Sequence, residues 1–259
     1  MGGESTTRTA PRAGGASGGA AGGRTGQRVS GLVMALGLVL FLGGFAWAAV
    51  LYRPYTVPTS SMAPTIGVGD RVLAQRVGGE EIRRGDVVVF TDKTWVSNAP
   101  VVKRVVAVGG DTVACCTDGR LTVDGKRIDE PYLAEDSLSG IRNFPTVTVP
   151  KGRLFLLGDE RSGSLDSTAH LTDAAGGTVA ASAVSARVDA VVWPMNGMLE
   201  RPSGFEKLGP LSSPGPLRTV FAMIVVGAVL VLGGGAWGPV AKRLSGRSRG
   251  AGAESAGAR

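Results

Sequence analysis

The segment APVVKRVVAVGGD, residues 99–111, indicates most directly how this 259-residue chain folds. It is rich in valine, a β-branched residue that favours strands, and it ends on two glycines and an aspartate, which favour a turn. Neighbouring side chains of a strand point to opposite faces of the sheet. Lys103 and Arg104 are therefore expected to point in opposite directions, so that one of the two charges is directed toward an apolar face.

Further runs of β-branched residues recur between turn residues and predict an antiparallel β domain. Asp124 and Gly125 separate two alternating runs, which is a strong hairpin signal. No stretch of this region keeps helical apolar spacing for three turns, so an array of alternating strands and helices is not expected. The predicted strands lie at 71–77, 85–90, 101–108, 120–128, 146–149, 153–158 and 186–193.

Two uncharged apolar runs, residues 31–52 and 219–241, predict a transmembrane helix on each side of the β domain. Each run is long enough to cross a hydrocarbon core of roughly 30 Å. The first run has a second interpretation, because Ala-Trp-Ala at residues 46–48 could end a cleavable secretory signal. The apolar run continues through Tyr52, which favours a permanent anchor.

The excess of positive charge lies in the two tails and predicts the orientation of the chain. The formal net charge is +7, and the tails hold nine of the 28 basic residues and two of the 21 acidic ones, so the remaining 19 and 19 cancel. By the positive-inside rule both tails are cytoplasmic and the central segment is extracytoplasmic. The charge thus reflects topology, and no nucleic-acid partner is expected. Residues 1–29 and 242–259 hold few large apolar side chains and are expected to be disordered.

The cysteines and the histidine limit metal chemistry. Cys115 and Cys116 are adjacent, and the sequence leaves open whether they form a strained vicinal disulfide or two free thiols. Together with a single histidine, His170, they supply too few ligands for a typical zinc site. No metal is expected.

A serine nucleophile needs a base to accept its proton. The stretch VPTSSMAPT, residues 57–65, offers two adjacent serines, and the residue pattern does not choose between them. One possible base is His170, oriented by Asp166 or Asp173. The other is Lys103, whose pKa would fall if the apolar strand buried it. The pattern by itself favours a lysine that extends to water at a sheet edge.

Four blocks taken together resemble bacterial type I signal peptidase, and the second apolar run resembles forms of that family found in actinobacteria. The blocks follow an N-terminal span in the family's order. They are PTSSMAPT (58–65), RGDVVVF (84–90), KRVVAVGGD (103–111) and GDERSGSLDS (158–167).

The resemblance implies a membrane serine protease that removes signal peptides with a Ser-Lys dyad and needs no cofactor. It assigns Ser61 as nucleophile, Lys103 as general base, and Ser164 as the group that orients the lysine. The backbone N–H of Ser61 and the hydroxyl of Thr59 would form the oxyanion hole. The matching structural ion-pair positions are Arg104, Asp159 and Asp166.

Two residues depart from the family pattern. Glu160 stands where asparagine is frequent, and Thr168 replaces an arginine that usually pairs with the carboxylate of Asp166. The second change puts local stability in doubt. The alternative function is therefore a catalytically degenerate β domain that is anchored in the membrane and binds envelope partners, although the intact Ser61 and Lys103 argue against it.

Specificity should follow from small apolar pockets around the dyad. Such pockets would accept alanine one and three residues before the cleaved bond, so the expected partners are secretory preproteins with A-x-A cleavage sites, together with membrane lipid. The residues expected to line the pockets are Val57, Pro58, Met62, Val101 and Val102.

The expected organisation has a mainly β catalytic domain between two transmembrane helices. It comprises a disordered tail at 1–29, a helix at 30–52, the catalytic domain at 53–200 with a β insertion at 112–150, a linker at 201–218, a helix at 219–241 and a disordered tail at 242–259.

Overall fold

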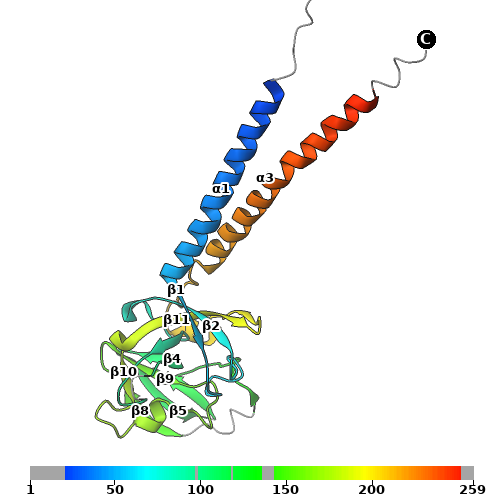
Figure 1. Cartoon of the computed structure of the whole chain (residues 1–259). Coiled ribbons are helices and arrows are strands. Elements are labelled where there is room, and N and C mark those ends of the chain that lie inside the picture. The colour runs from blue at the N-terminus through cyan, green and yellow to red at the C-terminus, as the bar shows by residue number, and fades with distance from the viewer. Residues whose placement is uncertain (1–20, 97–98, 118, 136–142, 252–259) are drawn as a thin grey trace, which may run out of the picture. The chain divides into compact units, whose positions relative to one another are not determined.

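The computed structural model of the chain contains two compact units (Figure 1). It describes residues 21–96, 99–117, 119–135 and 143–251. The helical unit combines residues up to Phe45 with those from Phe221 onward, and the β unit spans Ala46–Val220. The chain thus enters and leaves the β unit through its two long helices.

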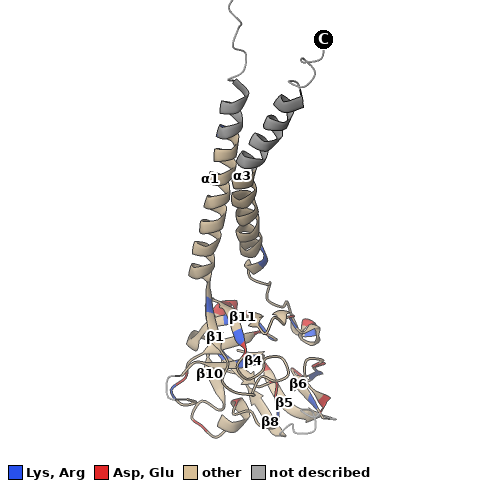
Figure 2. Cartoon of the chain, turned by 45° about the vertical axis from the view of Figure 1, so that its right-hand side comes forward, with Lys and Arg blue, Asp and Glu red and all other residues tan. Residues whose placement is uncertain are grey.

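The two long helices are α1, Ala21–Leu51, and α3, Leu217–Ala251. Their stretches Arg28–Leu51 and Leu217–Ala236 are long and apolar enough to cross a membrane, with mean hydropathies of 2.2 and 2.3. Charged side chains are sparse along these two stretches (Figure 2). The predicted tails differ from the structure, because residues 21–29 and 242–251 continue the helices. The rest of both predicted tails, 1–20 and 252–259, lies outside the described residues.

Glycines let the two helices approach each other closely. A side chain at Gly227 would collide with the backbone of Phe41 and with the carbonyl of Gly37. About two turns further along α3, the carbonyl of Gly234 accepts a hydrogen bond of 2.8 Å from the Ser30 hydroxyl of α1. Small residues at such a contact allow the backbone packing that drives helix association in lipid.

We expect Gly227→Leu to separate α1 from α3, whereas Gly235→Leu should not, because nothing lies within 4 Å of a side chain at Gly235. Spin labels on Leu36→Cys and Val229→Cys, both exposed positions, would report the separation. Pulsed electron resonance in lipid should give a longer, broader distance distribution for Gly227→Leu alone. The same distribution in both variants would contradict the assigned contact.

The β unit contains a large antiparallel sheet that carries both Lys103, on β4, and the loop with Ser61, between β1 and β2. The strand order is β1-β2-β11-β3-β4-β9-β10, with β12 paired to β11. Strand β4 is therefore an interior strand between β3 and β9. The strands are β1 Tyr52–Thr56, β2 Arg71–Gln75, β3 Val87–Phe90, β4 Val101–Val108, β9 Arg153–Leu157, β10 Thr178–Ala180, β11 Val184–Trp193 and β12 Gly197–Met198.

A second, four-stranded sheet occupies the segment expected as a β insertion. Its order is β7-β6-β5-β8, and Asp124 and Gly125 form the tight turn between β6 and β7 with positive φ values of 49° and 70°. Cys115 and Cys116 are joined by a disulfide in β5. The strands are β5 Thr112–Thr117, β6 Arg120–Val123, β7 Lys126–Arg127 and β8 Phe144–Thr148.

Sequence patterns identified the long strands and missed short ones. Strands β1, β5, β10 and β12 were not predicted. Strand β1 directly continues the apolar helical run, β5 and β10 are interrupted by polar and small residues, and β12 has only two residues. Short 3-10 helices complete the β unit: η1 Gly79–Glu81, η2 Ser167–His170, η3 Ala181–Ala183 and η4 Ser203–Leu208.

The predicted linker at 201–218 is wrong, because this segment is folded onto the β unit. Helix η4 inserts Phe205, fully buried, into the hydrophobic cluster that also contains Phe155 and residues of the small sheet. The side chains of Arg201 and Ser212 bind buried carboxylates. The segment is rich in proline, glycine and polar residues, so its composition suggested a linker, whereas Arg201, Phe205 and Ser212 have buried partners.

Candidate active site

Residues 57–70, which connect β1 to β2, form a closed loop that carries the candidate nucleophile. The Val57 amide donates to the Asp70 carbonyl at 2.9 Å, and the Gly69 amide donates back to the Val57 carbonyl at 2.8 Å. The Asp70 carboxylate also accepts the Gly67 amide at 2.7 Å. These bonds close the base of the loop, so that its tip has a defined backbone shape.

Ser61 lies at the tip of this loop and is held there from outside. Its carbonyl accepts the Glu160 amide at 3.2 Å. The hydroxyl oxygens of Ser61 and Thr59 are 3.2 Å apart and share a hydrogen bond. The hydroxyl of Thr59 therefore points toward the Ser61 oxygen, where it could also approach a charge that develops on a bound substrate.

Lys103 is buried in β4, with 3% of its surface exposed, and Arg104 beside it has 2% exposed. In the register of β3 with β4 they lie opposite Val88 and Val87, respectively. The interpretation that Lys103 extends to water at a sheet edge is wrong, because β4 is an interior strand. Both faces of the sheet are covered at this point, so the side chains of Lys103 and Arg104 are both buried.

Burial changes the acid–base chemistry of the lysine. It lowers the pKa of the Lys103 ammonium to about 8, because desolvation penalises the charged form more than the nearby carboxylates of Asp166 and Asp159 stabilise it. No ion pair of Lys103 is found among the described residues. An appreciable neutral fraction of this amine near neutral pH gives it the capacity to accept a proton.

Ser61 and Lys103 line the same cavity, which has a volume of about 330 Å³. Of the residues predicted to form substrate pockets, Val57, Pro58, Val101 and Val102 also line it. Met62 does not, because it is fully buried in the core beneath the loop. Residues that the sequence did not single out complete the walls: Tyr55, Thr56, Val89, Val96, Ala99, Pro100, Gly163 and Leu165.

Ser164 is placed next to Ser61 by a glycine. A side chain at Gly158 would collide with both the Ser164 hydroxyl and the Ser61 carbonyl, so these two groups flank the same backbone position. The Ser164 hydroxyl is buried and has no hydrogen-bond partner within the described part of the chain. Its position directly between Gly163 and Leu165, which line the cavity, leaves this hydroxyl free to bind another group.

An ion pair links the lysine strand to the end of the nucleophile loop. The Arg104 guanidinium donates to both carboxylate oxygens of Asp159, at 2.8 and 2.6 Å. The Thr65 hydroxyl donates to the same carboxylate at 2.5 Å. The Tyr132 ring covers the guanidinium, 3.9 Å from its centroid. The neighbours of these residues in the chain, Lys103 and Glu160, are thereby fixed relative to the loop.

Asp166, at a position that the resemblance assigns to an ion pair, is bound by neutral donors. Its carboxylate accepts hydrogen bonds from the Gly158 amide at 3.0 Å and from the amide and hydroxyl of Thr168 at 3.1 and 2.8 Å. These neutral donors satisfy the carboxylate, so the arginine expected at residue 168 is not needed for local hydrogen bonding. Sequence reasoning missed the buried pair of Arg161 with Glu130 in the same region, because the two residues are far apart in the chain.

His170 is engaged elsewhere. Its Nδ1 lies 2.7 Å from an Asp173 carboxylate oxygen, and its ring stacks on Trp95 at a centroid distance of 4.5 Å. Neither His170 nor Asp173 lines the cavity that contains Ser61. The structure therefore does not assemble the alternative triad.

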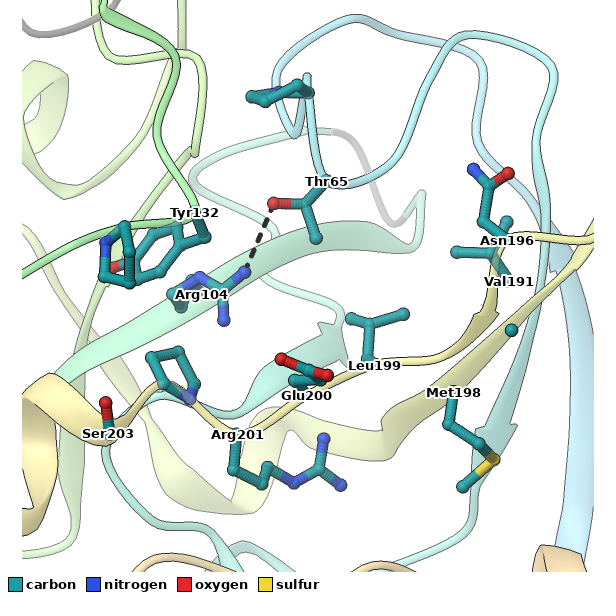
Figure 3. A pocket seen from close by; sticks show the side chains of 14 residues that line it. Thr65, Arg104, Tyr132, Val191, Asn196, Met198, Leu199, Glu200, Arg201 and Ser203 are labelled. Carbon is teal, nitrogen blue, oxygen red and sulfur yellow. Dashed lines mark hydrogen bonds between the residues drawn. The ribbon is translucent and has the colours of Figure 1, made fainter.

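A larger cavity of about 520 Å³ contains neither Ser61 nor Lys103. Figure 3 shows Thr65, Tyr132 and Arg104 on one side of it and the segment with Leu199, Glu200 and Arg201, which follows β12, on the other. Its buried arginine is already paired with Asp159. The smaller cavity is the better candidate active site, because it combines a hydroxyl nucleophile with a buried amine.

Comparison with known proteins defines the family. Residues 27–193, more than half of the chain, match the family described as signal peptidase, peptidase S26. The chain therefore belongs to this family.

Similar individual proteins are named as signal peptidases. A signal peptidase I of Mycobacterium tuberculosis (strain CDC 1551 / Oshkosh) is 36% identical, with 55% of this chain and 65% of that protein covered. A probable signal peptidase I of Mycobacterium leprae is 33% identical, with 62% and 74% covered. A signal peptidase I of Bacillus amyloliquefaciens is 37% identical, with 52% and 71% covered. The chain thus spans about 65% of the length of the first of these relatives.

A solved signal peptidase I from Enterococcus faecalis V583 matches 46% of this chain and 96% of its own at 26% identity. The TM-score is 0.34, which is too low for a comparison of folds.

The buried Arg104–Asp159 pair should contribute far more to stability than an exposed pair. We expect Asp159→Ala to lower the free energy of unfolding by about 3–5 kcal/mol, because it leaves the Arg104 charge buried without a partner. Asp129→Ala removes a carboxylate from the exposed pairs with Arg120 and Lys207 and should cost about 0–1 kcal/mol. Denaturant titration followed by tryptophan fluorescence would measure both, and equal losses would contradict the assigned role of the pair.

Proposed function

We propose that this chain is a membrane-bound serine endopeptidase that removes signal peptides from secretory preproteins. Membership of the peptidase family and the named relatives support the reaction class. The observation that carries the proposal is the single cavity lined by Ser61 and by the buried amine of Lys103.

In the proposed acylation step, the neutral Lys103 amine accepts the Ser61 hydroxyl proton while the oxygen attacks the carbonyl carbon of the scissile bond. The oxygen of that carbonyl becomes an oxyanion, which the Ser61 N–H and the Thr59 hydroxyl would stabilise. The tetrahedral intermediate then collapses. The departing amine takes the proton from the Lys103 ammonium, and the signal peptide stays bound to Ser61 as an ester.

Deacylation repeats the proton transfer with water. Lys103 accepts a proton from a water molecule, the hydroxide attacks the ester carbonyl, and the Ser61 oxygen leaves with the proton that Lys103 returns. The buried Ser164 hydroxyl would accept a hydrogen bond from the lysine amine and keep its lone pair directed at Ser61. Its lack of another partner among the described residues supports this role.

The shape of the cavity favours short side chains near the cleaved bond. Val57, Val101 and Val102 form apolar walls around a volume of about 330 Å³, which suits an extended peptide with alanine at the positions of the A-x-A pattern. Both helices would span the membrane with cytoplasmic ends, according to the positive-inside rule, and the β unit would lie on the extracytoplasmic face in contact with lipid. A secretory preprotein inserted in the same membrane would then reach the cavity.

Substitution of the dyad tests the mechanism directly. We expect Ser61→Ala and Lys103→Ala each to lower cleavage of an A-x-A preprotein by about 10³-fold or more. His170→Ala and the exposed control Lys151→Ala should leave cleavage nearly unchanged. The measurement is single-turnover cleavage by folded protein in detergent. Loss of activity in His170→Ala with retention in Lys103→Ala would overturn the dyad, and inactivity of the wild type would overturn the proposed function.

The pH dependence provides a separate test of Lys103. Its pKa of about 8 implies that the active neutral amine is the minor form below pH 8. We expect kcat/KM to rise about tenfold per pH unit well below 8 and to level off above it. Stopped assays on a soluble peptide, with circular dichroism at each pH as the control for folding, would measure this profile. A rate that stays flat between pH 6 and 9 would argue against lysine as the base.

A further inference from the structure

A second group of buried charges lies in the β unit and has no part in the proposed mechanism. Asp86 and Asp189 are both 0% exposed, and Arg187 is 5% exposed. The side chain of Arg201, 10% exposed, lies between the two carboxylates. None of these residues lines the cavity of Ser61 and Lys103. Since buried charges are costly unless paired, such a cluster calls for a specific role.

The segment that precedes α3 supplies partners to both carboxylates. Arg201 donates to Asp189 at 2.6 Å and lies 3.4 Å from Asp86. The Ser212 hydroxyl donates to Asp86. Burial raises the pKa of the Asp86 carboxyl, and the hydrogen bond from Ser212 opposes that shift. The chain on both sides of η4 is therefore bound to the large sheet through largely buried polar contacts.

The end of α1 joins the same cluster. Tyr52 is the first residue after α1, and its hydroxyl donates to Asp189 at 3.2 Å. Leu217 is the first residue of α3, and its backbone N–H donates to the Tyr52 hydroxyl. A side chain at Gly215 would collide with Tyr52, Gln75 and Asp189, so the chain passes directly against these groups. Both helix ends thus meet at one phenol oxygen.

The cluster is also close in sequence to the nucleophile loop. Tyr52 begins β1, and β1 ends at Thr56, directly before the loop that carries Ser61. On the other side, Arg187 donates to Gln75 of β2 at 2.8 Å and to the Ser213 carbonyl at 3.0 Å. The cluster is therefore attached to both strands that flank the loop, while the shape of the loop itself is set by the hydrogen bonds across its own base.

We propose that Tyr52, Asp86, Arg187, Asp189, Arg201 and Ser212, together termed the anchor cluster, position the catalytic sheet for cleavage of substrates that are inserted in the membrane. A domain joined to one helix by one junction can rotate about that junction. The anchor cluster ties the sheet to the ends of both helices, and so restricts this rotation. The proposal rests on the proposed peptidase function. It makes these side chains positioning residues, since none of them lines the cavity.

The test uses the full chain in lipid nanodiscs and two substrates with the same A-x-A site. One substrate is a preprotein inserted in the nanodisc, and the other is a soluble peptide. The variant Tyr52→Phe/Ser212→Ala removes two neutral hydroxyls, while Asp86 and Asp189 keep their arginine contacts. Ser213→Ala is the matched control, because Ser213 contributes its backbone carbonyl and its side chain lies outside the cluster.

We expect the double variant to lose about tenfold or more in kcat/KM on the inserted preprotein, because small misplacements of reacting groups have large effects on rate. Cleavage of the soluble peptide should be unchanged, and Ser213→Ala should match the wild type on both substrates. Equal losses on both substrates would contradict the proposal, because they would indicate that the cluster only stabilises the fold. No loss on either substrate would overturn the proposal.

A second readout does not depend on activity. Trypsin should cut the wild type and Ser213→Ala slowly at Arg218, the exposed second residue of α3, and should cut the double variant faster. If the wild type cleaves neither substrate, the proposed peptidase function fails. Faster cutting of the double variant would then still show that the cluster anchors this segment. Equal cutting rates in all three proteins would contradict the proposal that the cluster anchors the segment before α3.

Discussion

The bidentate contact between Arg104 and Asp159 is the interaction on which the geometry of the candidate site depends. The Thr65 hydroxyl donates to the same carboxylate, so three segments meet at one buried charge pair: the β4 strand, the chain after β9 and the end of the nucleophile loop. Lys103 directly precedes the arginine, and Glu160, whose amide holds the Ser61 carbonyl, directly follows the aspartate. The proposed nucleophile and the proposed base are thus positioned by their neighbours in the chain.

The sequence predicted the parts of the fold that local patterns control. The long strands, the Asp124–Gly125 turn and the two apolar helices follow from alternation, turn chemistry and hydropathy, each of which acts over a few residues. The same patterns could not predict that Lys103 is buried. Alternation says that Lys103 and Arg104 face opposite ways, but only the tertiary packing on the two faces of β4 determines that both side chains are buried.

The errors at 201–218 and at Met62 have a common physical origin. Arg201 and Ser212 belong to a segment with few apolar residues, and its attachment depends on two aspartates that lie far away in the sequence. Met62 follows the nucleophile, and its burial depends on which side of the loop packs against the core. Long-range partners of this kind are set by tertiary structure. The resemblance of four blocks to a known family supplied Ser61 and Lys103, which periodicity could not.

The replacement of the usual arginine by Thr168 bears on the acidity of the lysine. Thr168 satisfies the Asp166 carboxylate with neutral donors and leaves its negative charge in place. That charge is the largest of the influences that raise the pKa of Lys103 against the effect of burial. An arginine at residue 168 would neutralise part of it and leave the lysine a weaker base. The pKa of about 8 is therefore a balance between desolvation and an unneutralised carboxylate. The departure from the family pattern thus bears on the chemistry of the proposed dyad as well as on the fold.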